Sequence, residues 1–303
     1  MADMSVNICG VEFKNPIIPA SGVFCYGKEY EEFYPLSKLG GITTKGTTGT
    51  LRPGNLAPRI AETPAGMLNS VGLQNPGIDT FIEQELPRLM TKDTVILANI
   101  AGSTLEECAE VAGKLNATDV HMIELNISCP NVRQGGAAFG TSCTMAEQVT
   151  AAVRKATSKP LVVKLSPNVT SITEIAKAVE AAGADAVSLI NTLLGMRIDI
   201  RTKRPVLRNN VGGLSGPAIF PVAVRMVWQT ANAVNIPVIG MGGVTTGEDA
   251  IELMMAGASA VQVGMACFTD PYAPVKIIDG MEQFLNENGV ASVRDIVGTV
   301  QPW

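Results

Sequence analysis

The chain has 303 residues, a net charge of -5 and 17% charged residues, so it is long enough to bury a sizeable apolar core. Its basic residues are scattered singly, which argues against nucleic-acid and anionic-membrane partners. The N-terminus lacks the basic start and apolar stretch of a signal peptide, and no apolar run approaches the roughly 18–20 residues that span a bilayer. We therefore expect a soluble, cytoplasmic protein.

Short runs rich in Val, Ile and Leu alternate with longer segments of helical spacing, which is typical of βα units around a parallel sheet. Eight strands are predicted, in chain order Ile17–Ala20, Gly41–Lys45, Val95–Asn99, His121–Asn126, Leu161–Leu165, Ala186–Ile190, Val238–Met241 and Ala260–Gly264. Helices are predicted between them at 79–90, 104–116, 144–157, 171–182, 217–233 and 246–256, with Ser103, Ser171 and Thr246 as candidate N-caps.

Repetition within the chain favours a closed barrel over an open sheet. Ala-Gly-Ala-Asp-Ala-Val at 182–187 recurs as Ala-Gly-Ala-Ser-Ala-Val at 256–261, and 256 minus 182 is 74 residues. Two βα units in 74 residues give 37 residues each, close to 303 divided by eight. No Gly-x-Gly-x-x-Gly follows the first strand, which argues against a dinucleotide-binding fold. We therefore predict a single α/β domain over residues 1–303 with a (β/α)8 TIM-barrel fold.

Two segments depart from a minimal barrel. Ser5–Ile8 and Val11–Phe13 predict an N-terminal β-hairpin that closes the barrel floor. Residues 46–78 are dense in Gly, Pro, Thr and Asn, and they predict a long inserted loop at the C-terminal face. Long loops in compact domains tend to be functional, so we expect this loop to contribute to the site.

The cysteine and histidine content limits the chemistry. Six cysteines are dispersed without a Cys-x-x-Cys pair, so disulfides and a cysteine-ligated metal centre are not expected. The chain has one histidine, His121, at the start of an apolar run, and we interpret it as structural. No metal site is predicted, because a zinc site built on a histidine cluster would need more than one histidine.

Barrel enzymes place their active groups at the C-terminal ends of the strands. In this sequence those ends hold three asparagines and two lysines, which predicts a polar, amide-rich mouth over an apolar core. In order, the strand ends carry Ala20-Ser21-Gly22, Thr44-Lys45-Gly46, Asn99, Asn126, Lys164, Asn191-Thr192, Gly240-Met241-Gly242-Gly243 and Gly264-Met265.

Glycines follow the last two strands at Gly242, Gly243 and Gly264, where barrel enzymes usually bind phosphate through backbone N–H groups. The alternative interpretation is a pair of tight strand-to-helix turns. Lys45 and Lys164 would add positive charge beside an electron-accepting ring such as a flavin. The alternative for the lysines is that both pair with carboxylates near the barrel mouth.

Cys129 follows the fourth strand and precedes Pro130, which favours an extended or turning conformation at the cysteine. By itself a buried inert thiol is the better interpretation. However, residues 131–141 contain three glycines and predict a mobile lid over the mouth, so Cys129 becomes a candidate base. We interpret the other five cysteines as structural.

Five motifs in order along almost the whole chain resemble class 1 dihydroorotate dehydrogenases. They are Asn-Ser-Val-Gly-Leu-Gln-Asn-Pro-Gly at 69–77, Asn-Ile-Ser-Cys-Pro-Asn at 126–131, Asn-Thr-Leu-Leu-Gly at 191–195, Gly-Gly-Leu-Ser-Gly-Pro at 212–217 and Ile-Gly-Met-Gly-Gly at 239–243. The Lys-Leu-Ser-Pro-Asn at 164–168 and Leu-Gln-Asn-Pro at 73–76 are similar to the class 1B catalytic subunit rather than the fumarate-using class 1A.

The resemblance implies one FMN per chain and oxidation of (S)-dihydroorotate to orotate in de novo pyrimidine (UMP) biosynthesis. Cys129 would take the C5 proton while C6 delivers hydride to flavin N5. The implied FMN contacts are Ser21, Lys45, Gly46, Asn99, Asn126, Lys164 and Ile190 around the ring, and Gly216, Gly242, Gly243, Gly264 and Met265 around the phosphate. The implied substrate contacts are Lys45, Asn69, Ser70, Val71, Gly72, Leu73, Asn126, Asn191 and Thr192.

The resemblance also implies a partner subunit that carries FAD and a [2Fe-2S] cluster and passes electrons to NAD, in a heterotetramer built on a homodimer of this chain. This chain lacks the cysteine spacing of such a cluster, which agrees with that division of work. Class 2 relatives use Ser as the base and carry an N-terminal membrane-associating segment, and neither feature is present. Met265 departs from the small polar residue of many relatives, and a backbone contact to phosphate would survive that change.

Other interpretations stay open from the sequence. One is a fumarate-coupled, class 1A-like or dihydropyrimidine dehydrogenase-like activity on the same scaffold, which an assay with fumarate in the absence of a partner would reveal. Another is a non-catalytic flavin-binding scaffold subunit, whose yellow colour dihydroorotate would not bleach. A phosphate-binding isomerase or aldolase barrel would instead give colourless protein.

Overall fold

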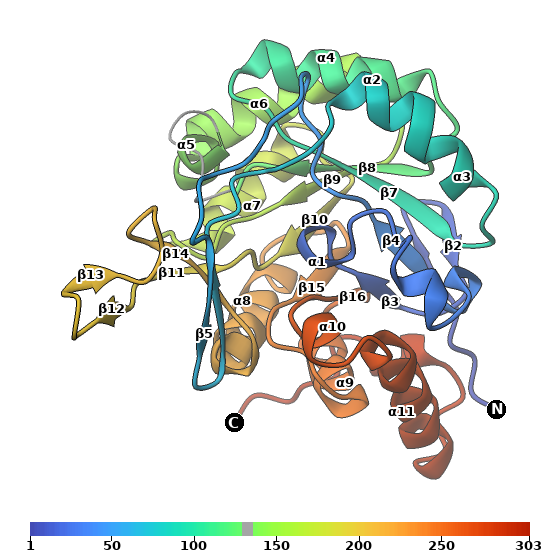
Figure 1. Cartoon of the computed structure of the whole chain (residues 1–303). Helices are drawn as coiled ribbons and strands as arrows, with labels where there is room; N and C mark the ends of the chain where they lie inside the picture. Colours follow the sequence, from blue (N-terminus) through green and yellow to red (C-terminus); the bar gives the residue numbers. More distant parts are fainter. Residues whose placement is uncertain (129–135) are drawn as a thin grey trace.

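The computed structural model describes residues 1–128 and 136–303, in which helices surround a central ring of strands (Figure 1). Eight parallel strands form one sheet in the order β3-β16-β15-β10-β9-β8-β7-β4. Their bounds are β3 Ile17–Pro19, β4 Gly41–Thr43, β7 Val95–Ile100, β8 Met122–Asn126, β9 Leu161–Lys164, β10 Ala186–Leu189, β15 Val238–Met241 and β16 Ala260–Val263. All eight strands predicted from the sequence are confirmed.

The two end strands of this sheet, β3 and β4, meet to close a (β/α)8 barrel. The backbone N–H of Gly40 donates to the carbonyl of Ile17 at 3.1 Å, and the side chain of Asn15 also contacts Gly40. Every residue of the eight strands is buried, because the barrel interior covers one face and the surrounding helices cover the other. This explains why the strands appear in the sequence as continuous apolar runs.

The predicted N-terminal hairpin is present as β1 (Val6–Ile8) and β2 (Val11–Phe13), paired antiparallel. Phe13 is fully buried, and its ring packs so closely on Gly41 that a Cβ there would lie 2.8 Å from it. Gly41 begins β4, so the hairpin covers the N-terminal end of the barrel, opposite the strand ends where the site was expected.

Helices connect the strands, and most of them occur where helical spacing predicts them. Thr246 caps its helix as predicted, in a capping box with Asp249, and Ser171 also caps as predicted. The expectation for Ser103 is wrong, because Thr104 is the N-cap of α4 and accepts from Glu107 N–H. The principal helices are α2 Ile78–Thr80, the π-helical η3 Phe81–Glu85, α3 Leu86–Met90, α4 Leu105–Asn116, α6 Cys143–Ala156, α7 Ile172–Ala181, α8 Phe220–Ala231, α9 Gly247–Met255 and α11 Ala273–Glu287.

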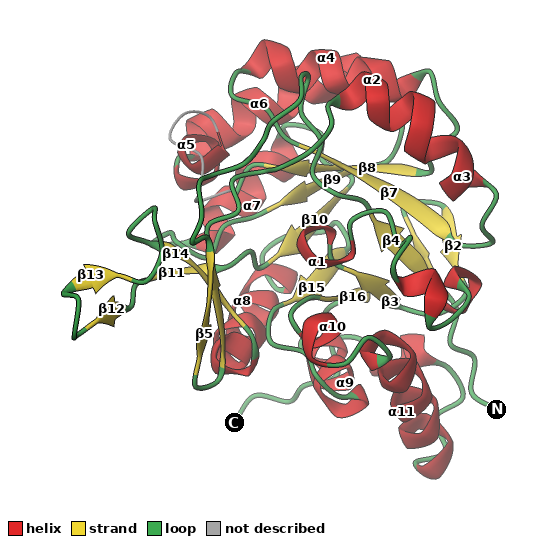
Figure 2. Cartoon of the chain, viewed as in Figure 1, coloured by secondary structure: helices red, strands yellow, loops and turns green. Residues whose placement is uncertain are grey.

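The interpretation of residues 46–78 as a long loop is only partly correct. The segment contains β5 (Ile60–Thr63) and β6 (Gly66–Asn69), which form a hairpin. That hairpin joins β14 (Gly212–Ser215) and β11 (Leu193–Gly195) in a four-stranded antiparallel sheet beside the barrel (Figure 2). A second hairpin, β12 (Ile198–Asp199) with β13 (Arg204–Pro205), projects from this sheet (Figure 1). The glycine-rich β14 pairs with β6, which lies far away in the sequence, and such a pairing gives little signal in a local sequence window.

The described cysteines are free thiols, and burial raises the pKa of Cys9 to about 11 and of Cys108 and Cys267 to about 12. Within residues 1–128 and 136–303, no cluster of three His, Cys, Asp or Glu side chains could hold a metal ion. In the same ranges, none of the helices combines the length and the apolar character needed to cross a membrane.

His121 has the structural role expected of it. Its Nδ1 accepts a hydrogen bond from the Ile96 N–H at 3.0 Å, and burial, with a smaller effect of Lys159, lowers the pKa of His121. Because the folded state disfavours the protonated ring, its contribution is complete above the unfolded pKa of about 6.5 and is lost as the pH falls toward the lowered folded value.

We therefore expect acidification below pH 6.5 to reduce the free energy of unfolding more in the wild type than in His121→Asn, by up to about 1.4 kcal/mol per pH unit. The asparagine carbonyl can accept from the Ile96 N–H without titrating. Denaturant unfolding at several pH values measures the difference between the two proteins. The same pH dependence in both would contradict this role.

Candidate active site

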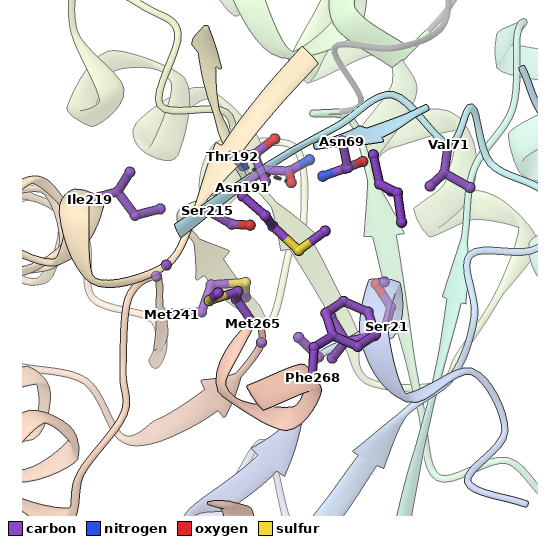
Figure 3. A pocket seen from close by; sticks show the side chains of 18 of the residues that line it. Ser21, Asn69, Val71, Asn191, Thr192, Ser215, Ile219, Met241, Met265 and Phe268 are labelled. Carbon is purple, nitrogen blue, oxygen red and sulfur yellow. Dashed lines mark hydrogen bonds between the residues drawn. The ribbon is translucent and has the colours of Figure 1, made fainter. Parts of the chain in front are cut away.

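A cavity of about 640 Å³ opens at the carboxyl ends of the barrel strands (Figure 3). It is lined by residues at or just after the ends of β3, β4, β7, β8, β9, β10, β15 and β16. The four-stranded sheet adds a wall through Met67, Asn69 and Ser215. The volume is typical of sites for small molecules and cofactors.

All but one of the described residues predicted to contact cofactor or substrate line this cavity. The exception is Ser70, which is fully buried and whose backbone holds the loop by bonds with Arg59 and Asn55. The residues brought together are Ser21, Lys45, Gly46, Asn69, Val71, Gly72, Leu73, Asn99, Asn126, Lys164, Ile190, Asn191, Thr192, Gly216, Gly242, Gly243, Gly264 and Met265.

Three of the predicted phosphate glycines have backbone conformations that favour glycine, with φ of 108° at Gly216, 123° at Gly242 and 83° at Gly243. A Cβ on Gly243 would lie 2.7 Å from the Cβ of Phe220 and 2.9 Å from the carbonyl of Gly216. Tight packing of the loops therefore explains these three glycines in part, as the alternative interpretation proposed.

Gly264 is different, because its φ is ordinary and a Cβ there would meet only the Cβ of Ala20, at 4.0 Å. Neither strain nor protein packing requires a glycine at this position. Close approach of a ligand to the backbone is the remaining physical reason for a residue without a side chain here.

The two lysines supply positive charge to the cavity. Lys164 is only 5% exposed, and neither Lys45 nor Lys164 forms an ion pair with a carboxylate of the described residues. The alternative in which both lysines pair with nearby carboxylates therefore finds no support in that part of the chain. A buried cation without an anionic partner favours binding of an anionic or electron-rich group.

The amide-rich mouth is held in place by hydrogen bonds that the sequence did not reveal. Asn126 Oδ1 accepts from the N–H and the hydroxyl of Ser128 at 3.1 and 2.8 Å. Asn191 Nδ2 donates to the Ser128 carbonyl and hydroxyl, and its Oδ1 accepts from Thr192 N–H at 2.8 Å. Asn168 in turn donates to the Thr192 carbonyl at 3.0 Å. The side-chain amides of Asn126 and Asn191 are thus oriented by their neighbours and are not free to rotate.

Cys129 lies outside the described residues, as do residues 131–135 of the predicted lid. The end of the lid segment, Gly136–Thr141, is a short helix, α5. Gly140 packs against the carbonyl of Ile127, where a Cβ would lie 2.4 Å away. The residue before Cys129, Ser128, is fixed between two cavity-lining asparagines.

Apolar side chains complete the cavity, and the sequence analysis assigned no ligand contact to four of them. They are Met67, Ile219, Met241 and Phe268, with Met241 at the end of β15 and Phe268 beside Met265 (Figure 3). Met241 lies within the glycine motif at 239–243, so its place in the sequence indicated that it lies at the cavity. Met67 belongs to the four-stranded sheet, which was not predicted.

Comparisons with known proteins agree with this arrangement. Residues 3–285 match the family model described as dihydroorotate dehydrogenase. The chain is 55% identical over 299 residues to "Dihydroorotate dehydrogenase B (NAD(+)), catalytic subunit" of Geotalea uraniireducens, covering 98% of each chain. It is 54% identical over 302 residues to the protein of the same name from Bacteroides thetaiotaomicron, covering 99% of this chain and 100% of that one. This chain therefore belongs to the dihydroorotate dehydrogenase family.

Proposed function

We propose that this chain is the catalytic subunit of an NAD-linked, FMN-dependent dihydroorotate dehydrogenase that oxidises (S)-dihydroorotate to orotate in de novo UMP biosynthesis. The observation that carries the proposal is one cavity lined by an array of asparagine amides and by two lysines that have no carboxylate partner among the described residues. Membership of the family and the full-length similarity to proteins named as NAD-dependent catalytic subunits support it.

The cavity suits FMN, the cofactor of this family. The glycine-lined backbone at Gly216, Gly242, Gly243 and Gly264 fits the phosphate, since close approach allows N–H groups to donate to it. Lys164 and Lys45 would stabilise negative charge on the ring. FMN, when bound, would accept the hydride that leaves C6 of the substrate.

For the substrate, the oriented asparagines offer both donors and acceptors, which suits a pyrimidine ring bearing a carboxylate. Asn191, Thr192 and Asn69 lie near one another at the mouth, and the loop after Asn69 continues the lining through Leu73. In this proposal Cys129 removes the C5 proton as a thiolate general base. Lys45 neutralises the substrate carboxylate.

The electrons would then leave through another protein. The relatives are named catalytic subunits, which implies a second subunit in those enzymes. We place FAD, a [2Fe-2S] cluster and the reaction with NAD on that partner, in a heterotetramer with a homodimer core of this chain. The free cysteines of the described residues are dispersed, and no cluster-type spacing occurs in the sequence.

Anaerobic addition of dihydroorotate to the purified chain tests the proposal. We expect yellow protein whose flavin absorbance near 450 nm, roughly the maximum of an oxidised flavin, bleaches on addition of substrate. Steady turnover should require the partner subunit and NAD, and fumarate should not replace them. Colourless protein, a flavin that dihydroorotate does not bleach, or rapid fumarate reduction by the chain alone would each contradict it.

Gly213 gives a prediction specific to substrate binding. A Cβ there would lie 1.9 Å from Thr192 Oγ1, so Gly213→Ala must displace Thr192 from its place at the mouth. We expect KM for dihydroorotate to rise about tenfold or more, because a misplaced polar contact costs about 1–3 kcal/mol. The affinity for FMN should change little, since Thr192 is assigned to the substrate and not to FMN. An unchanged KM, or loss of FMN of the same size, would argue against this assignment.

A further inference from the structure

Glu124 is a fully buried carboxylate for which the proposed mechanism has no use. It lies in the middle of β8 with its side chain in the barrel interior, where it contacts residues of three other strands. Its Oε1 accepts from Ser188 Oγ at 2.8 Å and from Gln262 Nε2 at 2.7 Å, and its Oε2 accepts from Asn99 Nδ2. Because β16, which carries Gln262, is not a neighbour of β8, these bonds cross the barrel.

All the described partners of Glu124 donate to it, and no described cation forms an ion pair with it. This polarity decides the orientation of Asn99. A carboxylate only accepts hydrogen bonds, so Asn99 must turn its NH2 group toward Glu124 and its Oδ1 away from it. The other orientation would place two oxygens against each other.

The Oδ1 of Asn99 is left buried and has no hydrogen-bond partner within the described residues. It lies against Gly46, where a Cβ would be only 2.7 Å from it. Asn99 and Gly46 both line the cavity, and Asn99 is 1% exposed. Leaving a buried acceptor without a donor is costly, so this oxygen marks a place where a ligand can supply one.

We propose that Glu124 is a positioning residue that fixes the Asn99 amide so that its Oδ1 accepts a hydrogen bond from an N–H or O–H group of the bound flavin. The identity of the ligand rests on the proposed function; the orientation of Asn99 does not. Glu124 acts through Asn99 and does not itself touch the ligand. The absence of a side chain at Gly46 leaves room for the ligand beside the oxygen.

The substitution E124Q separates orientation from packing, because it keeps the shape of the side chain. The oxygen of the introduced glutamine can still accept from Ser188 and Gln262, but its NH2 group then faces the NH2 group of Asn99. When the glutamine is held in this way, Asn99 rotates its amide, so that it presents a donor to the ligand where an acceptor was. We expect the Kd of the apoprotein for FMN to rise about tenfold or more.

A second set of variants moves the carboxylate from position 124 to position 99 and tests the same hydrogen bond. In N99D alone, two carboxylates face each other in the barrel, and we expect FMN affinity to fall by about tenfold or more. In the double variant E124Q/N99D the introduced glutamine donates to one oxygen of the introduced aspartate. The other oxygen is again an acceptor toward the ligand, and the net charge is that of the wild type. We expect this variant to bind FMN at least about tenfold more tightly than N99D.

The matched control is S188A, which removes a hydrogen bond from the far oxygen of Glu124 and leaves Asn99 in place. We expect its Kd for FMN to stay within about threefold of the wild type, although its apoprotein melts at a lower temperature. FMN binding is measured by quenching of flavin fluorescence, and the melting temperature of each apoprotein is measured in parallel.

Three outcomes would overturn the assignment: E124Q binds FMN within about twofold of the wild type, E124Q/N99D shows no recovery over N99D, or S188A loses as much affinity as E124Q. If E124Q does not fold, the comparison of N99D with E124Q/N99D still tests whether Glu124 positions the Asn99 amide. If neither of the two variants that lack Glu124 folds, Glu124 is a requirement of the fold and the positioning role is rejected. A wild-type protein that binds no FMN would instead reject the proposed function.

Discussion

Replacement of Cys129 by alanine is expected to slow reduction of the bound flavin by dihydroorotate about 10²–10⁴-fold at neutral pH, while FMN stays bound. The reason is that the C5 proton then has no positioned base, whereas the cavity residues that we assign to the cofactor are unchanged. Anaerobic stopped-flow measurement of flavin bleaching reports this step directly, without the partner subunit.

Two variants control this experiment. Cys129→Ser should retain slight activity that rises at high pH, because a hydroxyl is a much weaker base than a thiol. Cys143→Ala removes an exposed thiol at the start of α6 and should reduce its flavin at the wild-type rate. Equal rates in Cys129→Ala and Cys143→Ala would remove Cys129 from the mechanism.

A second large effect is expected for Gly243→Ala. Its φ of 83° disfavours any side chain, and the new Cβ would press on Phe220 and on the Gly216 carbonyl. We expect the free energy of unfolding to fall by about 1–3 kcal/mol from strain and crowding. We also expect FMN affinity to fall about tenfold or more, because the loops proposed to bind phosphate must move apart. Flavin release on dilution and denaturant unfolding measure the two effects.

Alanine substitutions at two other glycines distinguish the effect of backbone strain on stability from the effect of a side chain on ligand binding. Gly289→Ala introduces a residue at a φ of 66° with nothing within 4 Å, outside the cavity, so it should cost stability and leave FMN affinity unchanged. Gly264→Ala should fold with nearly wild-type stability, because its φ is ordinary and its surroundings are open, yet it should weaken FMN binding. If Gly264→Ala binds FMN as the wild type does, the phosphate does not approach this backbone as we propose.

The barrel could be predicted because its strands are buried on both faces. Each strand is therefore a short apolar run, and runs such as Val238–Met241 and Leu161–Lys164 are recognisable without knowledge of their neighbours. Once eight such runs are counted, the carboxyl-end rule for barrels places Lys45, Asn99, Asn126 and Lys164 in one site. These cavity residues at the strand ends were thus predictable from local sequence together with one topological rule, whereas Asn69, Val71 and Gly216 were suggested only by the family resemblance.

The four-stranded sheet was not predictable in the same way. Its strands β6 and β14 pair Asn69 with Gly213, residues far apart in the chain, and neither strand has the apolar alternation of an isolated strand. Ser70 belongs to this region, which is why the sequence motif suggested a ligand contact there although the residue is buried away from the cavity. A motif shows that residues belong together, but it does not show which way each side chain points.

By itself, the sequence determined the barrel, the end of the barrel at which the cavity opens, and the candidate base Cys129, because strand periodicity and position along the chain carry that information. Only the tertiary structure decided how the amides of that cavity are oriented. Asn99 is fixed by Glu124 of β8, which in turn accepts hydrogen bonds from side chains of β10 and β16 across the closed barrel. The direction of a hydrogen bond depends on which groups meet in space, and that meeting is set by barrel closure and not by any local run of residues.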